Sequence, residues 1–247
     1  MGRLDALKLR AVQDVNRFLR RLVAWMHGLE FRMLWQSDRA APEWFDHYLD
    51  VQFLWPSTGN TIALERGAFG HFAVRHGDRV MDICSGDGFY CRYFWSPRAS
   101  EVVGVDRDRA ALAHARRNNA ADNVTFIERD LVVDELPPGP FDAVTWNAGI
   151  EHFEENEILE ILAKVKRSLQ PGGVMAGTTD IHGEGGYVWH KREFRDADDL
   201  AQLLRQRFEH VTVETSEHPN RKELLFYASD DPSRIPFRHF GDARVTA

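Results

Sequence analysis

The sequence contains few cysteines and no long apolar segment, and both shortages exclude classes of protein. Cys84 and Cys91 are the two cysteines among 247 residues, and they fall on an expected strand end and an expected helix. We therefore expect no disulfide framework and, without a matching cysteine–histidine pair, no zinc site; a reducing, cytoplasmic setting is favoured. No stretch approaches the roughly 18 consecutive apolar residues that span a bilayer. Charged residues near the start interrupt any signal-peptide core.

Positive charge is also in short supply. The 31 Lys and Arg residues against 38 Asp and Glu give a net charge of −7, which disfavours nucleic acid as the main partner. The deficit is uneven, because residues 1–36 hold seven basic and three acidic side chains, a balance of +4 that leaves −11 for the rest. Hydrophobic residues make up 43% of the chain, enough for one large α/β domain with an appendage.

The basic segment 1–36 carries apolar residues at steps of three and four, which predicts one long amphipathic helix. The stripe consists of Leu4, Leu7, Ala11, Val15, Phe18, Leu22, Trp25 and Leu29. The favoured interpretation is that it packs against the rest of the chain or against a second subunit in a homodimer. The alternative is a peripheral contact with an anionic membrane surface.

The stretch Val80–Tyr90 predicts a buried strand that runs into a glycine turn. Residues 79–84 are mostly apolar, as in a parallel strand covered on both faces. Asp82 interrupts them near the carboxyl end, where open α/β sheets bind ligands. Gly86 and Gly88 allow positive φ and a close approach of the backbone to a ligand.

A predicted helix over 89–95 follows this turn and directs its amino end at the ligand. The spacing does not satisfy the G-x-G-x-x-G pattern of nicotinamide-binding domains, because Cys91 stands at the third position. An ordinary strand–helix turn is the alternative interpretation.

Strands and helices then alternate regularly, which predicts a mostly parallel sheet. The expected strands are 101–106, 123–130, 141–147, 174–179, 210–215 and 222–228, and the expected helices include 155–169 and 197–207. Too few residues join the last two strands for a crossover helix, so they are expected to be antiparallel neighbours.

Two acidic residues end consecutive strands of this alternation. Asp106 lies 20 residues beyond Gly86, a position suited to a carboxylate that accepts hydrogen bonds from ribose hydroxyls. Asp130 ends the next strand, and its alternative role is that of a turn residue. Two acids at one sheet edge favour a nucleoside-containing ligand.

Three motifs resemble those of class I S-adenosylmethionine-dependent methyltransferases. The 82–88 loop is similar to their acidic-x-Gly-x-Gly-x-Gly cofactor loop, with Cys84 in place of the first glycine. The Phe-Asp-x-Val opening at 141–144 and the Leu-x-Pro-Gly-Gly turn at 169–173 are further features of that family. Together with the two acids, the resemblance covers residues 78–180 or thereabouts.

This resemblance implies a seven-stranded, mostly parallel, doubly wound α/β sheet that ends in an antiparallel hairpin, with S-adenosyl-L-methionine as cofactor. In such proteins the acid equivalent to Asp130 accepts a hydrogen bond from the adenine amino group, and the next backbone N–H reaches the ring. The expected cofactor-binding residues are Asp82, Cys84, Ser85, Gly86, Gly88, Tyr90, Asp106, Arg107, Asp130, Leu131 and Asn147.

Histidines near the expected acceptor site are the candidates for a general base, which an alcohol acceptor requires. His152 follows the 141–147 strand and is the first candidate, with a backbone-bonded helix-start histidine as the alternative. His182 and His190 lie in a glycine-rich loop after the 174–179 strand. Glu151 is expected to orient the base or to bind the acceptor, although adjacent residues seldom face the same way. The Glu-x-x-Glu-His metal pattern is absent, so no required metal is expected.

The predicted organisation is a helical amino-terminal segment over 1–75, a methyltransferase domain over 76–230 and a tail over 231–247. Aromatic residues in 35–75 indicate short helices and loops that cover the ligand edge as a lid, or else plain core packing. The expected function is methylation of an oxygen on a sugar or another polar metabolite. The alternatives are methylation of nitrogen on a metabolite or protein, and a catalytically silent, cofactor-binding assembly partner.

Overall fold

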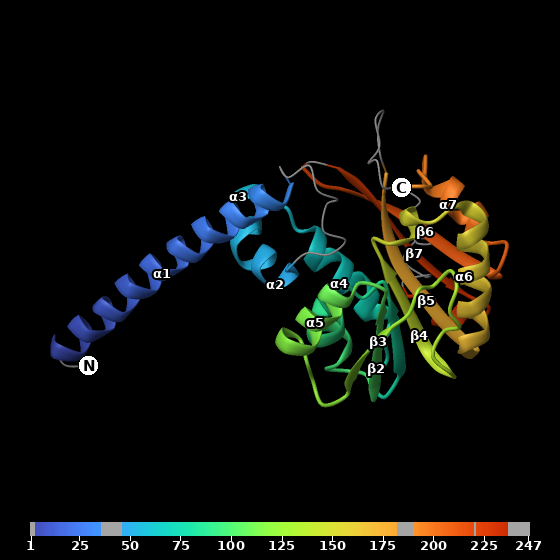
Figure 1. Cartoon of the computed structure of the whole chain (residues 1–247), viewed down its shortest axis with the longest axis horizontal. Helices are drawn as coiled ribbons and strands as arrows, with labels where there is room; N and C mark the ends of the chain where they lie inside the picture. Colours follow the sequence, from blue (N-terminus) through green and yellow to red (C-terminus); the bar gives the residue numbers. More distant parts are fainter. Residues whose placement is uncertain (1–2, 36–45, 182–189, 220, 237–247) are drawn as a thin grey trace, which may run out of the picture. The chain divides into compact units, whose positions relative to one another are not determined.

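The computed structural model describes residues 3–35, 46–181, 190–219 and 221–236 (Figure 1). The chain divides into two compact units, Met1–Asn60 and Thr61–Ala247. The expected domain boundary at residue 75 stays a prediction. No helix within the described ranges is long and apolar enough to cross a membrane.

The first unit consists of one long helix and three short helical segments. Helix α1 spans Arg3–Trp35 and confirms the long helix expected from the apolar periodicity. It is followed by α2 (His47–Leu49), η1 (Asp50–Leu54) and α3 (Trp55–Thr58). His27 connects α1 to the short segment η1 of the same unit, because its Nε2 lies 2.7 Å from Asp50 Oδ1. The expected lid function of this segment stays a prediction.

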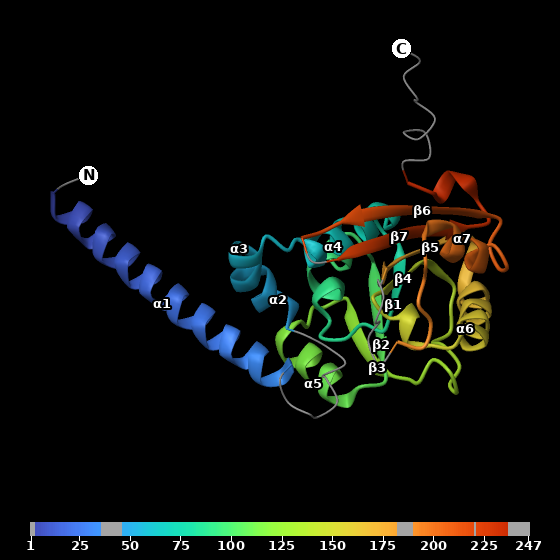
Figure 2. The same cartoon turned by 90° about the horizontal axis from the view of Figure 1, so that it is seen from above.

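The second unit is a seven-stranded sheet with helices on both faces (Figures 1 and 2). Its strands follow the order β3-β2-β1-β4-β5-β7-β6. The strands are β1 (Arg79–Ile83), β2 (Glu101–Asp106), β3 (Val124–Glu128), β4 (Phe141–Asn147), β5 (Leu169–Ile181), β6 (His210–Glu217) and β7 (Lys222–Ser229). The helical elements are α4 (Ile62–Ala73), η2 (Cys91–Trp95), α5 (Arg109–Asn118), η3 (Ile150–His152), α6 (Glu155–Ser168), α7 (Ala197–Leu204) and η4 (Pro232–Arg234).

The pairing confirms the predicted fold class. β1, β2, β3, β4 and β5 pair in parallel, whereas β7 runs antiparallel to both β5 and β6. Because the parallel strands are buried on both faces, they are continuous apolar runs in the sequence. The chain reverses strand order beside β1, so the carboxyl ends of β1 and β4 flank the switch point where such sheets bind ligands.

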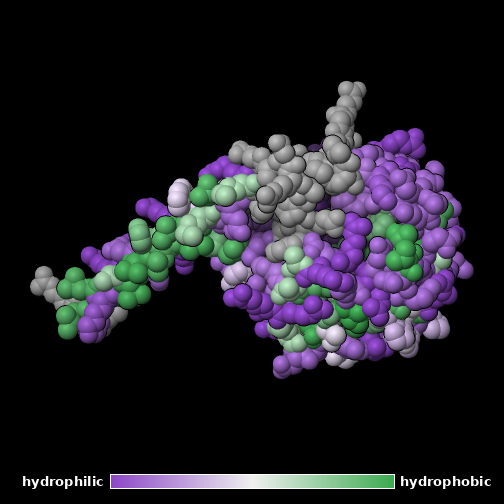
Figure 3. All heavy atoms as spheres, in the orientation of Figure 1, coloured by the Kyte–Doolittle hydropathy of each residue, from purple (hydrophilic) through white to green (hydrophobic). Residues whose placement is uncertain are grey.

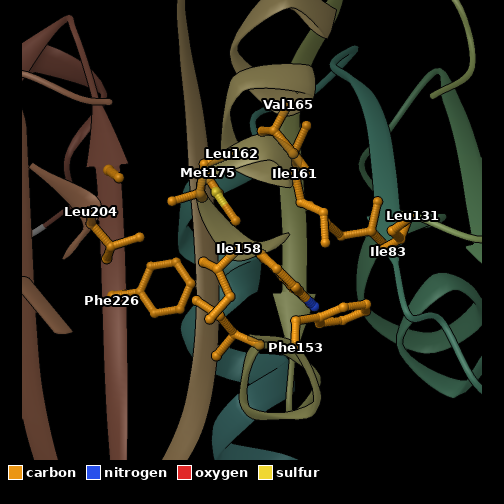
Figure 4. Packing of buried hydrophobic residues seen from close by; sticks show 14 of the residues in the cluster. Ile83, Leu131, Phe153, Ile158, Ile161, Leu162, Val165, Met175, Leu204 and Phe226 are labelled. Carbon is orange, nitrogen blue, oxygen red and sulfur yellow. The ribbon is translucent and has the colours of Figure 1, made fainter. Parts of the chain in front are cut away.

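The core between the sheet and α6 is dense (Figure 4). Ile158, Ile161, Leu162 and Val165 of α6 are fully buried, in agreement with the expected amphipathic helix. Each buried aliphatic side chain contributes about 1.5–3 kcal/mol, so this face alone fixes α6 on the sheet. Reciprocal capping bonds between Glu154 and Glu157 begin the helix.

Several strand ends differ from the expectation, by one or two residues in β3, β6 and β7 and at the end of β5. Two further differences have a local cause. β1 ends at Ile83 rather than Cys84, because Cys84 adopts φ +56° and leaves the strand. β5 begins at Leu169 rather than Val174, since Leu169 already pairs with Phe141. The register then shifts, and the turn at 170–173 forms an irregularity inside the strand.

Candidate active site

The glycine turn after β1 consists of alternate left-handed residues. Cys84, Gly86 and Gly88 have φ values of +56°, +52° and +74°. A non-glycine residue at positive φ is uncommon and costs free energy, so Cys84 marks a strained position at the point where the family loop has glycine. A Cβ at Gly88 would stand 2.5 Å from Phe126 Cζ, so this position has no room for a side chain.

Asp106, at the end of β2, is held against the turn by backbone groups. The Gly86 N–H donates to Asp106 Oδ2 at 2.8 Å, and the Asp108 N–H donates to Oδ1 at 2.8 Å. The structure therefore brings together two residues that the sequence had singled out separately. The neighbouring Arg107 is exposed. A fixed carboxylate beside an open glycine turn suits recognition of vicinal hydroxyls.

Asp82 lies deeper than the other predicted cofactor residues. Its carboxyl group is 2% exposed, Thr145 Oγ1 donates to Oδ1 at 2.5 Å, and Cys91 Sγ donates to Oδ2 at 3.2 Å. Burial raises its pKa to about 6, against the lowering effect of these bonds. Asp82 thus ties β1 to β4 and η2 beneath the turn, and its contact with a cofactor stays a prediction.

Two buried polar atoms near the strand ends lack a hydrogen-bond partner within the described part of the chain. They are Ser85 Oγ in the turn and Asn147 Nδ2 at the end of β4. The side-chain oxygen of Asn147, Oδ1, accepts a long hydrogen bond from Thr178 Oγ1 at 3.5 Å. A buried donor without a partner is costly, so both atoms are suited to meeting a polar ligand. Tyr90, which follows the glycine turn, is also buried, and this burial raises the pKa of its hydroxyl group.

Asp130 and Leu131 follow β3. The Val132 N–H donates to Asp130 Oδ1 at 2.9 Å, and the Asp130 N–H donates to Asp134 Oδ2 at 2.9 Å. Leu131 is buried in the main core. One carboxyl oxygen of Asp130 therefore stabilises the turn, as the alternative interpretation expected, and its predicted adenine contact is untested.

A second group of site residues gathers beyond β4 and β5, which we call the acid–base cluster: Glu151, His152 and His190. Each offers one polar atom, and these atoms lie within 4.8 Å of one another. Although they are adjacent in the chain, Glu151 and His152 thus face the same space. The rings of His152 and His190 are 5.2 Å apart and nearly perpendicular. His182 lies outside the described residues.

Backbone bonds hold His190 at this cluster. The N–H groups of Lys191 and Arg192 both donate to the Glu151 carbonyl oxygen, at 2.9 and 3.2 Å. The segment after the glycine-rich loop is therefore attached directly to η3. His190 Nδ1 also lies 3.3 Å from Glu193 Oε1.

Asp180 on β5 is a further acidic residue beside this cluster, and the sequence did not single it out. Its Oδ1 lies 3.8 Å from His190 Nδ1, and both side chains are 4% exposed. Burial, followed by the negative charge of Asp180, raises the pKa of Glu151 to about 8. Thr179 Oγ1 donates to Glu151 Oε2 at 2.9 Å. The raised pKa favours the neutral, protonated form of Glu151 near neutral pH.

A buried ionic chain connects Asp180 to α4, and this too was missed. Arg221 lies 3.7 Å from Asp180 and 2.9 Å from Glu223. Glu223 in turn accepts two bonds from the Arg66 guanidinium, at 2.8 and 2.7 Å. Burial opposes the charge on Glu223, but Arg66 and Arg221 outweigh it and lower the pKa of its carboxyl group. A glutamate inside an otherwise apolar strand was the available signal.

The spacing of the acid–base cluster would also permit a divalent cation, since a carboxylate and two imidazoles are common ligands. The expectation that no metal is required therefore stays a prediction. Cys84 and Cys91 are free thiols whose pKa values are raised by burial, so neither is an activated nucleophile.

Comparison with known proteins agrees with this geometry. A family model described as a methyltransferase domain matches residues 80–173. The chain is similar to a malonyl-[acyl-carrier protein] O-methyltransferase of Enterobacter lignolyticus, with 34% identity over 101 residues, 41% of this chain and 38% of that protein. It is also similar to a demethylmenaquinone methyltransferase of Thermus thermophilus, with 37% identity over 99 residues, 38% of this chain and 44% of that protein. The chain spans less than half the length of these two relatives.

Among solved structures, the fold is similar to that of the DhpI–SAH complex. The TM-score is 0.57 at 24% identity, over 75% of this chain and 91% of that one. The apo form of the S-adenosylmethionine-dependent methyltransferase SibL has a TM-score of 0.56 at 18% identity, over 74% and 57% of the two chains. At these identities the likeness supports the fold.

Proposed function

We propose that this chain, whose residues 80–173 match a methyltransferase-domain model, is a class I S-adenosylmethionine-dependent methyltransferase that transfers a methyl group from that cofactor to a hydroxyl oxygen of a small polar acceptor such as a sugar. The observation that carries the proposal is the acid–base cluster, with polar atoms of Glu151, His152 and His190 within 4.8 Å. Alcohol oxygens must lose a proton to become nucleophiles, and imidazole is suited to accept it near neutral pH.

The residues of the glycine turn fit the adenosyl group. The Asp106 carboxylate, fixed by the Gly86 and Asp108 N–H groups, would accept hydrogen bonds from the ribose hydroxyls. Ser85 Oγ and Asn147 Nδ2 are buried polar atoms without partners in the described ranges, as a polar ligand would require. When bound, the cofactor supplies an electrophilic methyl carbon on a sulfonium.

His152 is the general base in this proposal. It would accept the hydroxyl proton of the acceptor, so that the acceptor oxygen becomes a nucleophile for the methyl carbon that the bound cofactor would supply. The edge contact with His190, at 5.2 Å between rings, places a second imidazole next to the proton-accepting one. The Oδ1 atom of the buried Asp180, 3.8 Å from His190 Nδ1, places an acidic side chain beside this second imidazole.

The role proposed for Glu151 is that of a hydrogen-bond donor. Because its pKa is raised to about 8, it carries a proton at neutral pH and would donate a hydrogen bond to an acceptor oxygen. A donor next to a base fixes a hydroxyl group in one orientation, which is the main requirement of methyl transfer.

The test is incubation of the purified protein with S-adenosylmethionine and a panel of sugars and hydroxylated metabolites, analysed by mass spectrometry. A mass increase of one methyl group on an oxygen supports the proposal. A product methylated on nitrogen would show that the acceptor is an amine and would overturn the proposal. Cofactor binding without any product across amine and alcohol panels would indicate a catalytically silent binding protein.

A chelator separates the acid–base function from metal dependence. Activity that survives prolonged treatment with EDTA supports proton transfer by the cluster itself. Loss of activity that only an added divalent cation restores would make the same three side chains metal ligands and would overturn the role of His152 as base.

A further inference from the structure

Helix α1 presents an unusually broad apolar face to solvent. The stripe predicted from the sequence is exposed along the helix, with Phe18 and Trp25 exposed by 65% and 61%, and Met33, beyond the predicted stripe, is exposed by 66%. Figure 3 shows the apolar surface running along α1. Leu4, Leu7, Val12, Val15, Leu19, Leu22, Val23, Met26 and Leu29 are exposed as well. Large exposed apolar patches mark interaction surfaces.

The opposite face of α1 is rich in arginine. At about 100° per residue, Arg10, Arg17 and Arg21 fall together on the side facing away from Leu22. Arg3, Arg20 and Arg32 fall on the same polar side, where Asp14, paired with Arg17, is the acidic residue. The helix therefore separates an apolar face from a strongly basic one.

The width of the apolar face argues against a two-stranded coiled coil. Such a seam is a narrow line of residues spaced three and four apart. Here Val12, Leu19, Met26 and Met33 form a further apolar row beside Phe18 and its line, so apolar residues extend over roughly 160° at about 100° per residue, with Lys8, Glu30 and Asp5 as the charged residues within that arc. Exposed Trp25 and Phe18 add aromatic rings of the kind enriched at membrane interfaces.

The short helices of the same unit cover another side of α1. His27 is 7% exposed, bonds Asp50 and contacts the ring of Phe53. On the helix, His27 lies about 130° from the centre of the apolar face, at about 100° per residue. Packing within the unit therefore stabilises α1 and leaves its apolar face open.

We propose that α1 lies flat in the interface of an anionic lipid bilayer. The apolar face enters the boundary between headgroups and acyl chains, and Arg3, Arg21 and Arg32, which border it on the Trp25 side, bind lipid phosphates, which their planar guanidinium groups match well. The charge division of the chain supports this occupant, since the segment holding α1 carries +4 while the remainder carries −11. An acidic surface is repelled by such a membrane, so attachment is confined to this helix.

The experiment uses the full-length protein in flotation with phosphatidylcholine vesicles, with and without phosphatidylglycerol. We expect the protein to float with the anionic vesicles alone and to be released by high salt. Arg17→Glu with Arg21→Glu should reduce partitioning by about fivefold or more for each arginine lost. Arg17→Lys with Arg21→Lys, which keeps the charge, should retain flotation. Phe18→Ser with Trp25→Ser should abolish it.

Circular dichroism and sedimentation of the same variants complete the test. Unchanged helicity shows that the losses are not due to unfolding. Absence of flotation by the wild type would overturn the proposal. In that case, a wild-type dimer that Phe18→Ser with Trp25→Ser converts to a monomer identifies a second copy as the occupant. A monomer whose unfolding temperature falls in that variant identifies packing within the chain.

Discussion

The two halves of the sheet's carboxyl edge are built by different means. Beyond β1 and β2, the ligand-facing groups are mainly backbone, shaped by Gly86 and Gly88 and locked by one carboxylate, Asp106. Beyond β4 and β5, they are buried titratable side chains, Glu151 and His190 among them. A backbone site can be specified by a short sequence motif, whereas the side-chain site depends on contacts between distant segments.

This contrast suggests a division of labour in which the first half holds the cofactor and the second handles the acceptor's proton. Variants in one half should then change cofactor affinity and leave catalysis of bound substrates alone, and variants in the other should do the reverse. Each prediction below can break that separation.

The largest expected effect comes from Gly86→Val. Gly86 takes φ +52° and donates its N–H to Asp106, so a branched side chain strains the turn at the residue that fixes that carboxylate. We expect no measurable S-adenosylmethionine binding by calorimetry. Gly77→Val is the matched control, because Gly77 also has positive φ, at +86°, but a Cβ there meets nothing within 4 Å. Both carry a comparable strain of about 1–2 kcal/mol. Equal cofactor affinities in both variants would show that the glycine turn does not bind the cofactor.

His152→Ala tests the other half. A placed general base contributes about a hundredfold to ten-thousandfold, so kcat should fall by that factor while cofactor affinity stays within a few-fold. Raising the pH should not restore the rate with an alcohol acceptor. His76→Ala, at an exposed position in the turn before β1, serves as the histidine control with unchanged kcat. A normal rate in His152→Ala would pass the role to His190 or His182, or indicate an acceptor nitrogen already deprotonated in solution.

The same contrast explains how much the sequence could predict. The β2 and β4 bounds and the antiparallel β6–β7 pair follow from apolar runs and loop length, which are local. The Gly86–Asp106 bond could be anticipated from a fixed spacing in a βαβ unit.

Contacts in the second half have no such local signature. Nothing in the residues around Asp180 indicates that it lies beside His190, or that Arg221 and Glu223 connect it to α4. Glu151 and His152 were predicted to serve one site although adjacent residues seldom face the same way, and the tight η3 turn together with the Lys191 and Arg192 bonds turns both toward one space. Burial and distant partners, which decide these positions, emerge only when the sheet is assembled.

Asp106→Ala should have an intermediate effect. Loss of hydrogen bonds to a charged acceptor costs about 1.5–3 kcal/mol, which corresponds to cofactor binding roughly tenfold to 150-fold weaker. Asp106→Asn keeps one acceptor oxygen and should lie between Ala and wild type. Calorimetry measures both, with kcat at saturating cofactor as the second readout. A large fall in kcat at saturation would show that the two halves are not separable.

The last prediction concerns the pH dependence of stability in the side-chain half. The pKa of Glu151 is raised from 4.5 to about 8 in the folded protein, so the folded state keeps a proton that the unfolded state releases. This group's stabilising contribution is complete below about pH 4.5 and is lost as the pH rises towards about 8, at up to ~1.4 kcal/mol per pH unit. Glu151→Gln has no proton to lose. Its urea midpoint relative to wild type should therefore rise from about pH 5 to about pH 8, while the exposed α6 variant Glu160→Gln should track wild type. Parallel curves for wild type and Glu151→Gln would mean that Glu151 titrates normally, and the proposed hydrogen-bond donor to the acceptor would be lost with it.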